Sequence, residues 1–133
     1  MKVFLLTIMF FLSVPLCAEA QMAITVNNTI SCDVNALVIS YDGLCNSITN
    51  FGWVNIPGNQ STDFGEPNVS VIEFTIDIVV DPSGTPIVFP TMSTSGGCGG
   101  IPAHSDPTAC AGGNVNASVG ALAPSWFELL ITP

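Results

Sequence analysis

The sequence predicts an all-β protein, an antiparallel β-sandwich of the immunoglobulin-like kind with about seven or eight strands. Two observations favour this class. Apolar residues alternate with more polar ones over 69–80, which is the period of a strand with one buried face. Short runs rich in β-forming residues are also separated by clusters of Gly, Pro, Asn and Asp, which favour turns. A small closed barrel is the alternative architecture.

The strands can be placed in order along the chain. They are expected at 23–26, 34–41, 51–56, 69–80, 87–89, 115–119 and 126–132. In the clearest strand, Phe74, Ile76 and Ile78 are expected to face the core. The aromatic residues are expected to pack in the core rather than to form a ligand platform: Phe51, Trp53, Phe64, Phe74, Phe89, Trp126 and Phe127.

Residues 1–20 have the features of a cleaved export signal. Lys2 supplies a basic start, and 3–16 is an apolar run of the length that such signals use. This run is too short to span a bilayer comfortably, because a membrane helix needs about 20 apolar residues. Ala18 and Ala20 place small residues where a signal peptidase reads the chain. An uncleaved anchor and a lipidated Cys17 are the alternatives.

The remainder, 21–133, is expected to form one domain that works outside the cell. It contains no Lys or Arg, because Lys2 is the only such residue of the chain. Nucleic acid is therefore excluded as a partner, and anionic membrane surfaces are disfavoured. The acidic residues must be solvated, hydrogen-bonded or bound to a cation: Asp33, Asp42, Asp63, Glu66, Glu73, Asp77, Asp81, Asp106 and Glu128.

Loss of Cys17 with the signal leaves an even number of cysteines, which is typical of a disulfide framework in a small exported domain. They are Cys32, Cys45, Cys98 and Cys110. Three pairings are open to four cysteines. Proximity in the sequence favours Cys32 with Cys45 and Cys98 with Cys110. A four-thiolate zinc site is the competing interpretation, but the C-x-x-C spacing of such sites is absent.

The segment 91–113 is rich in glycine and carries two of the cysteines. A structureless connection of this length is uncommon in a small domain. Its ends are expected to be joined by Cys98 and Cys110. It would then serve either as a presented binding loop or as a solvated crossover between the sheets.

The sequence offers little for nucleophilic catalysis. The only histidine is His104, followed by Ser105 and Asp106 in the Gly-rich segment. Three neighbouring residues do not adopt the geometry of a Ser-His-Asp triad by being adjacent. The G-x-S-x-G and H-E-x-x-H motifs are absent. The sequence therefore predicts a protein that is not an enzyme.

Paired carboxylates leave a secreted carbohydrate-active hydrolase as the alternative function. The candidate pairs are Asp63 with Glu66 and Glu73 with Asp77. Glu73 and Asp77 would lie about 13 Å apart on one strand face, too far for a retaining mechanism. An exposed polar stripe accounts for the second pair better.

Calcium is the ion that the composition suits best, because it takes oxygen ligands from carboxylates and loop carbonyls. The candidates beside predicted turns are Asp42, Asp63, Glu66, Asp81 and Asp106. No D-x-[DN]-x-[DN]-G loop is present, and Asp also favours turns without any ligand. In a eukaryotic host, four N-x-[ST] sequences would be glycosylation candidates, at Asn27, Asn59, Asn68 and Asn116.

Two segments carry a resemblance. The sequence ITVNNTISCDV and the pattern W-x-x-I-P-G-x-x-S at 53–61 resemble small uncharacterised secreted bacterial β-sandwich proteins. This resemblance implies export and the fold, and it carries no activity. The FGW at 51–53 is similar to the fungal cerato-platanins, but their C-G-T-C-W segment is absent.

These observations together predict a secreted, non-catalytic β-sandwich that acts as an extracellular binding or surface-interaction module. Its partner would be an extracellular protein or a glycan. Self-association through a strand edge is a further expectation, because no Lys is available to protect an edge.

Overall fold

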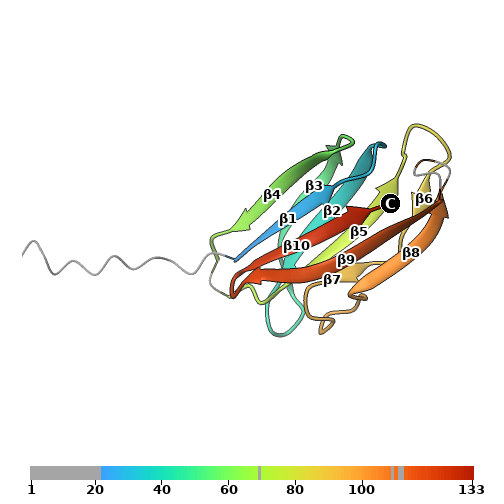
Figure 1. Cartoon of the computed structure of the whole chain (residues 1–133). Coiled ribbons are helices and arrows are strands. Elements are labelled where there is room, and N and C mark those ends of the chain that lie inside the picture. The colour runs from blue at the N-terminus through green and yellow to red at the C-terminus, as the bar shows by residue number, and fades with distance from the viewer. Residues whose placement is uncertain (1–21, 69, 109, 111–112) are drawn as a thin grey trace, which may run out of the picture.

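The computed structural model describes residues 22–68, 70–108, 110 and 113–133, so the predicted export signal lies outside the described residues. Ten strands form two five-stranded sheets that pack face to face as a sandwich (Figure 1). The sheets do not close into a barrel. The predicted fold class is confirmed, with ten strands in place of seven or eight.

Sheet A has the order β4-β1-β10-β9-β8 and sheet B the order β3-β2-β5-β6, with β7 also paired to β5. Sheet A contains β1 (Met22–Asn28), β4 (Gln60–Glu66), β8 (Ala103–Thr108), β9 (Gly113–Ala123) and β10 (Trp126–Thr132). Sheet B contains β2 (Val34–Tyr41), β3 (Ser47–Ile56), β5 (Glu73–Val80), β6 (Ile87–Val88) and β7 (Met92–Ser93). Strand pairing is antiparallel except between β1 and β10, which are parallel.

The core lies between the sheets, where the alternation of each strand places its apolar residues. Sheet A contributes Ile24, Val26, Val115, Ala117, Leu129 and Ile131, and sheet B contributes Val34, Ala36, Val38, Phe74, Ile76, Ile78 and Val80. The predicted inward face of 74–80 is thus confirmed. The expected exposure of the other face is wrong at its start, because Glu73 and Thr75 are buried as well. The segment that follows β7 covers them.

The prediction that both tryptophans lie in the core is wrong. Trp53 is 55% exposed and Trp126 45% exposed. In β3 the cause is a bulge at Gly52, which has φ of 75° and donates its amide hydrogen to Asn50 Oδ1 at 2.8 Å. The bulge turns Phe51 inward, where its ring meets that of Phe64 with centroids 5.6 Å apart. Trp53 consequently shares the outer face of sheet B.

The expected disulfide pairing is also wrong. The bonds join Cys32 to Cys110 and Cys45 to Cys98, over separations of 78 and 53 residues. Cys32 precedes β2 and Cys45 follows it, so the two bonds lie at opposite ends of that strand. Sequence proximity failed as a criterion because folding brings loops distant in the chain to the same end of the sandwich.

The Gly-rich segment 91–113 is not structureless. It contains β7 and β8, and Ile101 forms a parallel bridge with Met92. Gly100 has φ of 115°, and a Cβ there would lie 2.9 Å from the Ser93 Cβ. The glycines therefore let this part of the chain fold tightly against β7.

Candidate functional site

The predicted catalytic candidates His104, Ser105 and Asp106 lie on β8, an edge strand of sheet A. His104 and Asp106 pair with residues whose side chains point into the core, whereas Ser105 points to the opposite face. His104 Nε2 lies 3.3 Å from Asp106 Oδ2, and its ring packs edge-on against Phe89 with centroids 5.1 Å apart. The serine is therefore out of reach of the histidine. Inward-facing charged residues on an edge strand instead hinder pairing with another chain.

The candidate pair Asp63 and Glu66 is also separated by the pleat of a strand. Asp63 is exposed on the outer face of β4, whereas Glu66 is buried between the sheets. Glu66 accepts hydrogen bonds from the Ser40 hydroxyl at 3.2 Å and the Asn68 amide at 3.0 Å. Burial acts to raise the pKa of Glu66, but hydrogen bonds from Thr49, Asn68 and Ser40 outweigh it and lower the pKa. Glu66 thus fastens the end of β4 to sheet B.

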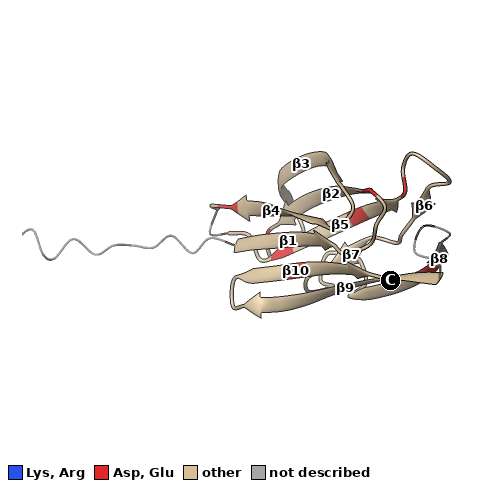
Figure 2. Ribbon diagram, turned by 45° about the horizontal axis from the view of Figure 1, so that its top comes forward, with Lys and Arg blue, Asp and Glu red and all other residues tan. Residues whose placement is uncertain are grey.

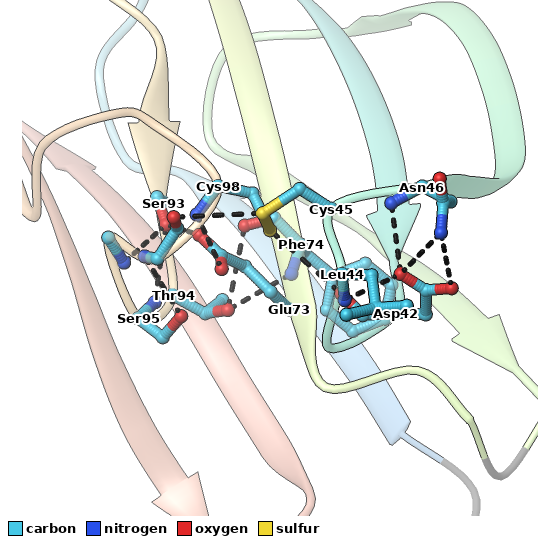
Figure 3. Close-up of a disulfide and its surroundings, with 12 residues drawn as sticks. Asp42, Leu44, Cys45, Asn46, Glu73, Phe74, Ser93, Thr94, Ser95 and Cys98 are labelled. Atoms are coloured by element: carbon cyan, nitrogen blue, oxygen red, sulfur yellow. Dashed lines mark hydrogen bonds between the residues drawn. A yellow bond between two sulfur atoms is a disulfide. The ribbon is translucent and has the colours of Figure 1, made fainter.

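Glu73 has a structural position beneath the segment 93–98, which we call the covering segment (Figure 3). Its carboxylate accepts a hydrogen bond from the Ser93 hydroxyl and another from the Cys98 amide at 3.0 Å. Ser93 Oγ in turn accepts the Gly96 amide hydrogen at 2.7 Å. A Cβ at Gly97 would lie 3.0 Å from Glu73 Oε2, so glycine permits this close approach. The expectation of an exposed Glu73 is wrong.

The five calcium candidates are distributed over the molecule. Asp42 accepts the amide hydrogens of Leu44 at 2.8 Å and Asn46 at 2.9 Å. The Asn46 side chain, together with these backbone amides, lowers the pKa of Asp42. Asp81 accepts from Ser83, and Asp106 lies against His104. Across the described part of the chain, no three His, Cys, Asp or Glu side chains gather in a way that could hold a metal ion.

A different feature of the structure has the properties of a binding site. It is an open hollow of about 380 Å³ on the outer face of sheet A, which we call the Trp126 hollow, lined by Ala23, Asp63, Gly65, Ser125 and Trp126. The strand register explains it. Ala23 on β1 is the register partner of both Trp126 on β10 and Gly65 on β4. The large side chain of Trp126 therefore stands beside Ala23 and Gly65, which have almost no side chain.

Hydrogen bonds fix the side chains at this hollow. The indole Nε1 of Trp126 donates to Thr25 Oγ1 at 2.9 Å, and Thr25 Oγ1 donates to Asp63 Oδ1 at 2.7 Å. Asp63 Oδ2 has no hydrogen-bond donor among the described residues. Farther along the same face, Asn27 Nδ2 donates to Glu128 Oε1 at 2.9 Å. The hollow thus presents a held indole and a carboxylate with an oxygen available to a ligand.

Sequence reasoning missed this site because it assigned Trp126 to the core. A usable signal was present in β10, whose sequence is WFELLIT. Alternation places Trp126 on the same face as Glu128, and a glutamate indicates the exposed side. The contributions of Ala23 and Gly65 could not be found in this way, because they depend on which strands are neighbours.

Acidic residues are spread over the described part of the chain. Figure 2 shows Asp and Glu on both sheets and their connecting loops, and the described chain contains no Lys or Arg to neutralise them. Within the residues described, no helix has the length and apolar character needed to cross a membrane. Comparison of the chain with models of known protein families, with curated proteins and with solved structures found no match.

Proposed function

We propose that this protein is an exported, non-catalytic binding module that contacts its ligand through the Trp126 hollow on the outer face of sheet A. The observation that carries the proposal is the indole of Trp126. It is 45% exposed in an open hollow, and its Nε1 is held by Thr25. An aromatic side chain fixed before binding offers a large contact area at little cost in conformational entropy.

The two disulfides support a location outside the cytoplasm, where an oxidising environment preserves such bonds. The apolar N-terminal run and the small residues at Ala18 and Ala20 support export by a cleaved signal. Mass spectrometry of the protein recovered from the medium or periplasm tests this part. A chain that begins at Gln21 is expected, and an intact chain that retains Met1 would contradict it.

The hollow supports binding over hydrolysis. Glycoside hydrolases use two carboxyl groups on either side of the bond that is cleaved. Among the described residues, Asp63 is the one carboxylate that lines the hollow. Glu66 faces the interior, and Glu128 already accepts the Asn27 amide. The secreted hydrolase remains the alternative proposal, and release of sugar from a polysaccharide by the purified protein would support it.

The outer face of sheet B favours self-association as a second candidate function. Trp53 and Val88 are 55% and 69% exposed there, and the register places Leu37 and Val79 on the same face. An exposed apolar patch is a common feature of protein interfaces. Sedimentation at rising concentration is expected to show oligomers that Trp53→Ser weakens. A wild-type protein that stays monomeric at high concentration would sink this candidate.

A binding screen tests the main proposal. Wild type, Trp126→Ala and the matched control Trp53→Ala are applied to arrays of glycans and extracellular proteins, with and without calcium. We expect wild type and Trp53→Ala to bind the same spots and Trp126→Ala to lose them, because only Trp126 lines the hollow. Ligands that Trp126→Ala retains in full would overturn the proposed site. Binding that requires calcium would instead support the calcium site expected from the sequence.

A further inference from the structure

Building on the proposed function, we propose that the Trp126 hollow receives a cationic side chain, the ammonium of a lysine or the guanidinium of an arginine, from a basic partner protein. The juxtaposition of an indole and a carboxylate with an open oxygen points to this ligand. Both groups line the same hollow. The described residues contain no Lys or Arg that could pair with either group.

Charge supplies the first argument. Lys2 is the only Lys or Arg of the chain, so the described residues contain none. In the register of sheet A, Thr25 is the partner of Asp63 on one side and of Glu128 on the other. Strands are spaced about 4.8 Å apart, so the two carboxylates lie on one face at roughly twice that distance. Such a face attracts cations and repels phosphate, sulfate and acidic chains.

The indole supplies the second argument, independent of the first. Tryptophan is the side chain whose ring attracts a cation most strongly, at distances within about 6 Å of the ring centre. Its Nε1 hydrogen bond to Thr25 fixes the orientation of Trp126, so little freedom is lost when a ligand stacks on it. Asp63 is tied to the same threonine by a bond of 2.7 Å. Thr25 therefore sets the positions of both groups relative to each other.

The two groups complement each other in the way a lysine or arginine requires. The aliphatic stem of such a side chain packs against apolar surface, whereas its charged head group stays in a polar environment. Trp126 and Ala23 offer that surface, and Asp63 Oδ2 offers an acceptor for the head group. A neutral sugar would also stack on the indole and could donate a hydroxyl hydrogen bond to Asp63, but because it carries no charge its binding would not weaken in high salt. This difference separates the two ligand classes experimentally.

The test uses an acetylated peptide of alternating Lys and Gly, with a Gln-for-Lys peptide as its neutral control. Binding is followed by isothermal titration calorimetry, which needs no tryptophan reporter and so measures Trp126→Phe in the same way as the other variants. We expect saturable binding of the Lys peptide that weakens in high salt, because exposed charges are screened. Asp63→Asn and Trp126→Phe are each expected to weaken binding roughly three- to tenfold. Glu128→Gln, on the same face but outside the hollow, is expected to change it less than either.

Four results would overturn the inference. The Lys and Gln peptides could bind equally, or the Lys peptide could fail to bind at all. Asp63→Asn and Glu128→Gln could weaken binding equally, which would indicate a diffuse charge effect without a site. A neutral oligosaccharide could bind in a way that depends on Trp126 but not on salt. The last result would overturn the cationic ligand and would still support the proposed binding function.

Discussion

The outer faces of the two sheets differ in how the chain uses one carboxylate, that of Glu73 on sheet B and that of Asp63 on sheet A. On sheet B, the covering segment lies over Glu73, which accepts hydrogen bonds from Ser93 and Cys98, and the Cys45–Cys98 disulfide fastens it (Figure 3). On sheet A, Asp63 accepts one bond from Thr25 and is left exposed beside Trp126. Glu73 is thus satisfied by its own chain, whereas Asp63 has capacity left for a ligand.

The two tryptophans show the same difference. Trp53 on sheet B is exposed beside Leu37, and its indole has no hydrogen-bond partner among the described residues. Trp126 on sheet A is held by Thr25 at the edge of a hollow. Exposure alone therefore does not distinguish a binding residue. The useful criteria are a fixed orientation and an adjacent polar group whose hydrogen bonds are incomplete.

Removal of the disulfide that fastens the covering segment is the strongest way to break this comparison. Cys45→Ser with Cys98→Ser releases a bond that spans 53 residues. Loss of the constraint on the unfolded chain is expected to lower the free energy of unfolding by about 4 kcal/mol. Denaturant unfolding measures this loss. Amide hydrogen exchange at 95–97 is expected to speed up, because these residues are no longer held over Glu73.

The matched control for that experiment is Cys32→Ser with Cys110→Ser. This bond spans 78 residues, so its loss is expected to cost about as much stability. The amides at 95–97 should nevertheless stay protected, because this bond lies at the other end of β2. Equally fast amide hydrogen exchange at 95–97 in both double variants would show that the covering segment is not held by the Cys45–Cys98 disulfide.

Glu73→Ala is expected to have the next largest effect. The Ser93 hydroxyl and the Cys98 amide would both lose their acceptor in a buried place. Each unsatisfied donor costs about 1–3 kcal/mol, so a loss of roughly 3 kcal/mol in unfolding free energy is expected. The control is Asp63→Ala on sheet A, where the exposed position predicts a change within about 0.5 kcal/mol. Similar losses in both variants would contradict the distinction between the two faces.

The residues that were predicted correctly from the sequence are those whose environment follows from local alternation. Phe74, Ile76 and Ile78 face the core because a strand repeats every two residues and one face is apolar. The positions of Glu73 and the cysteines could not be predicted in this way. The partners of Glu73 lie 20 and 25 residues away along the chain, and the disulfide partners lie 53 and 78 residues apart.

The Trp126 hollow was predictable only in part. The alternation of β10 could have placed Trp126 beside Glu128 on the exposed face, but the general tendency of tryptophan to be buried was given more weight. The hollow itself needs Ala23 and Gly65 beside Trp126. That neighbourhood depends on the parallel pairing of β1 with β10, which no local pattern specifies because the two strands lie at opposite ends of the described chain.

The smallest expected effect concerns the acid sensitivity of the loop that carries Cys45. Asn46 and Leu44 donate hydrogen bonds to Asp42 and lower its pKa in the folded protein. A lowered folded-state pKa stabilises the fold at pH values above the ordinary pKa of an aspartate. This stabilisation is lost as the pH falls through the folded-state pKa. Unfolding free energy measured from neutral to acidic pH should therefore decline less steeply in Asp42→Asn than in wild type.

Asn46→Ala separates the contribution of the side chain from that of the backbone. It removes the largest cause of the lowered Asp42 pKa, the Asn46 amide, and leaves the backbone donors of Leu44 and residue 46 in place. The acid decline of this variant is expected to lie between those of wild type and Asp42→Asn. If all three proteins lose stability in parallel, Asp42 does not link the loop at Cys45 to pH.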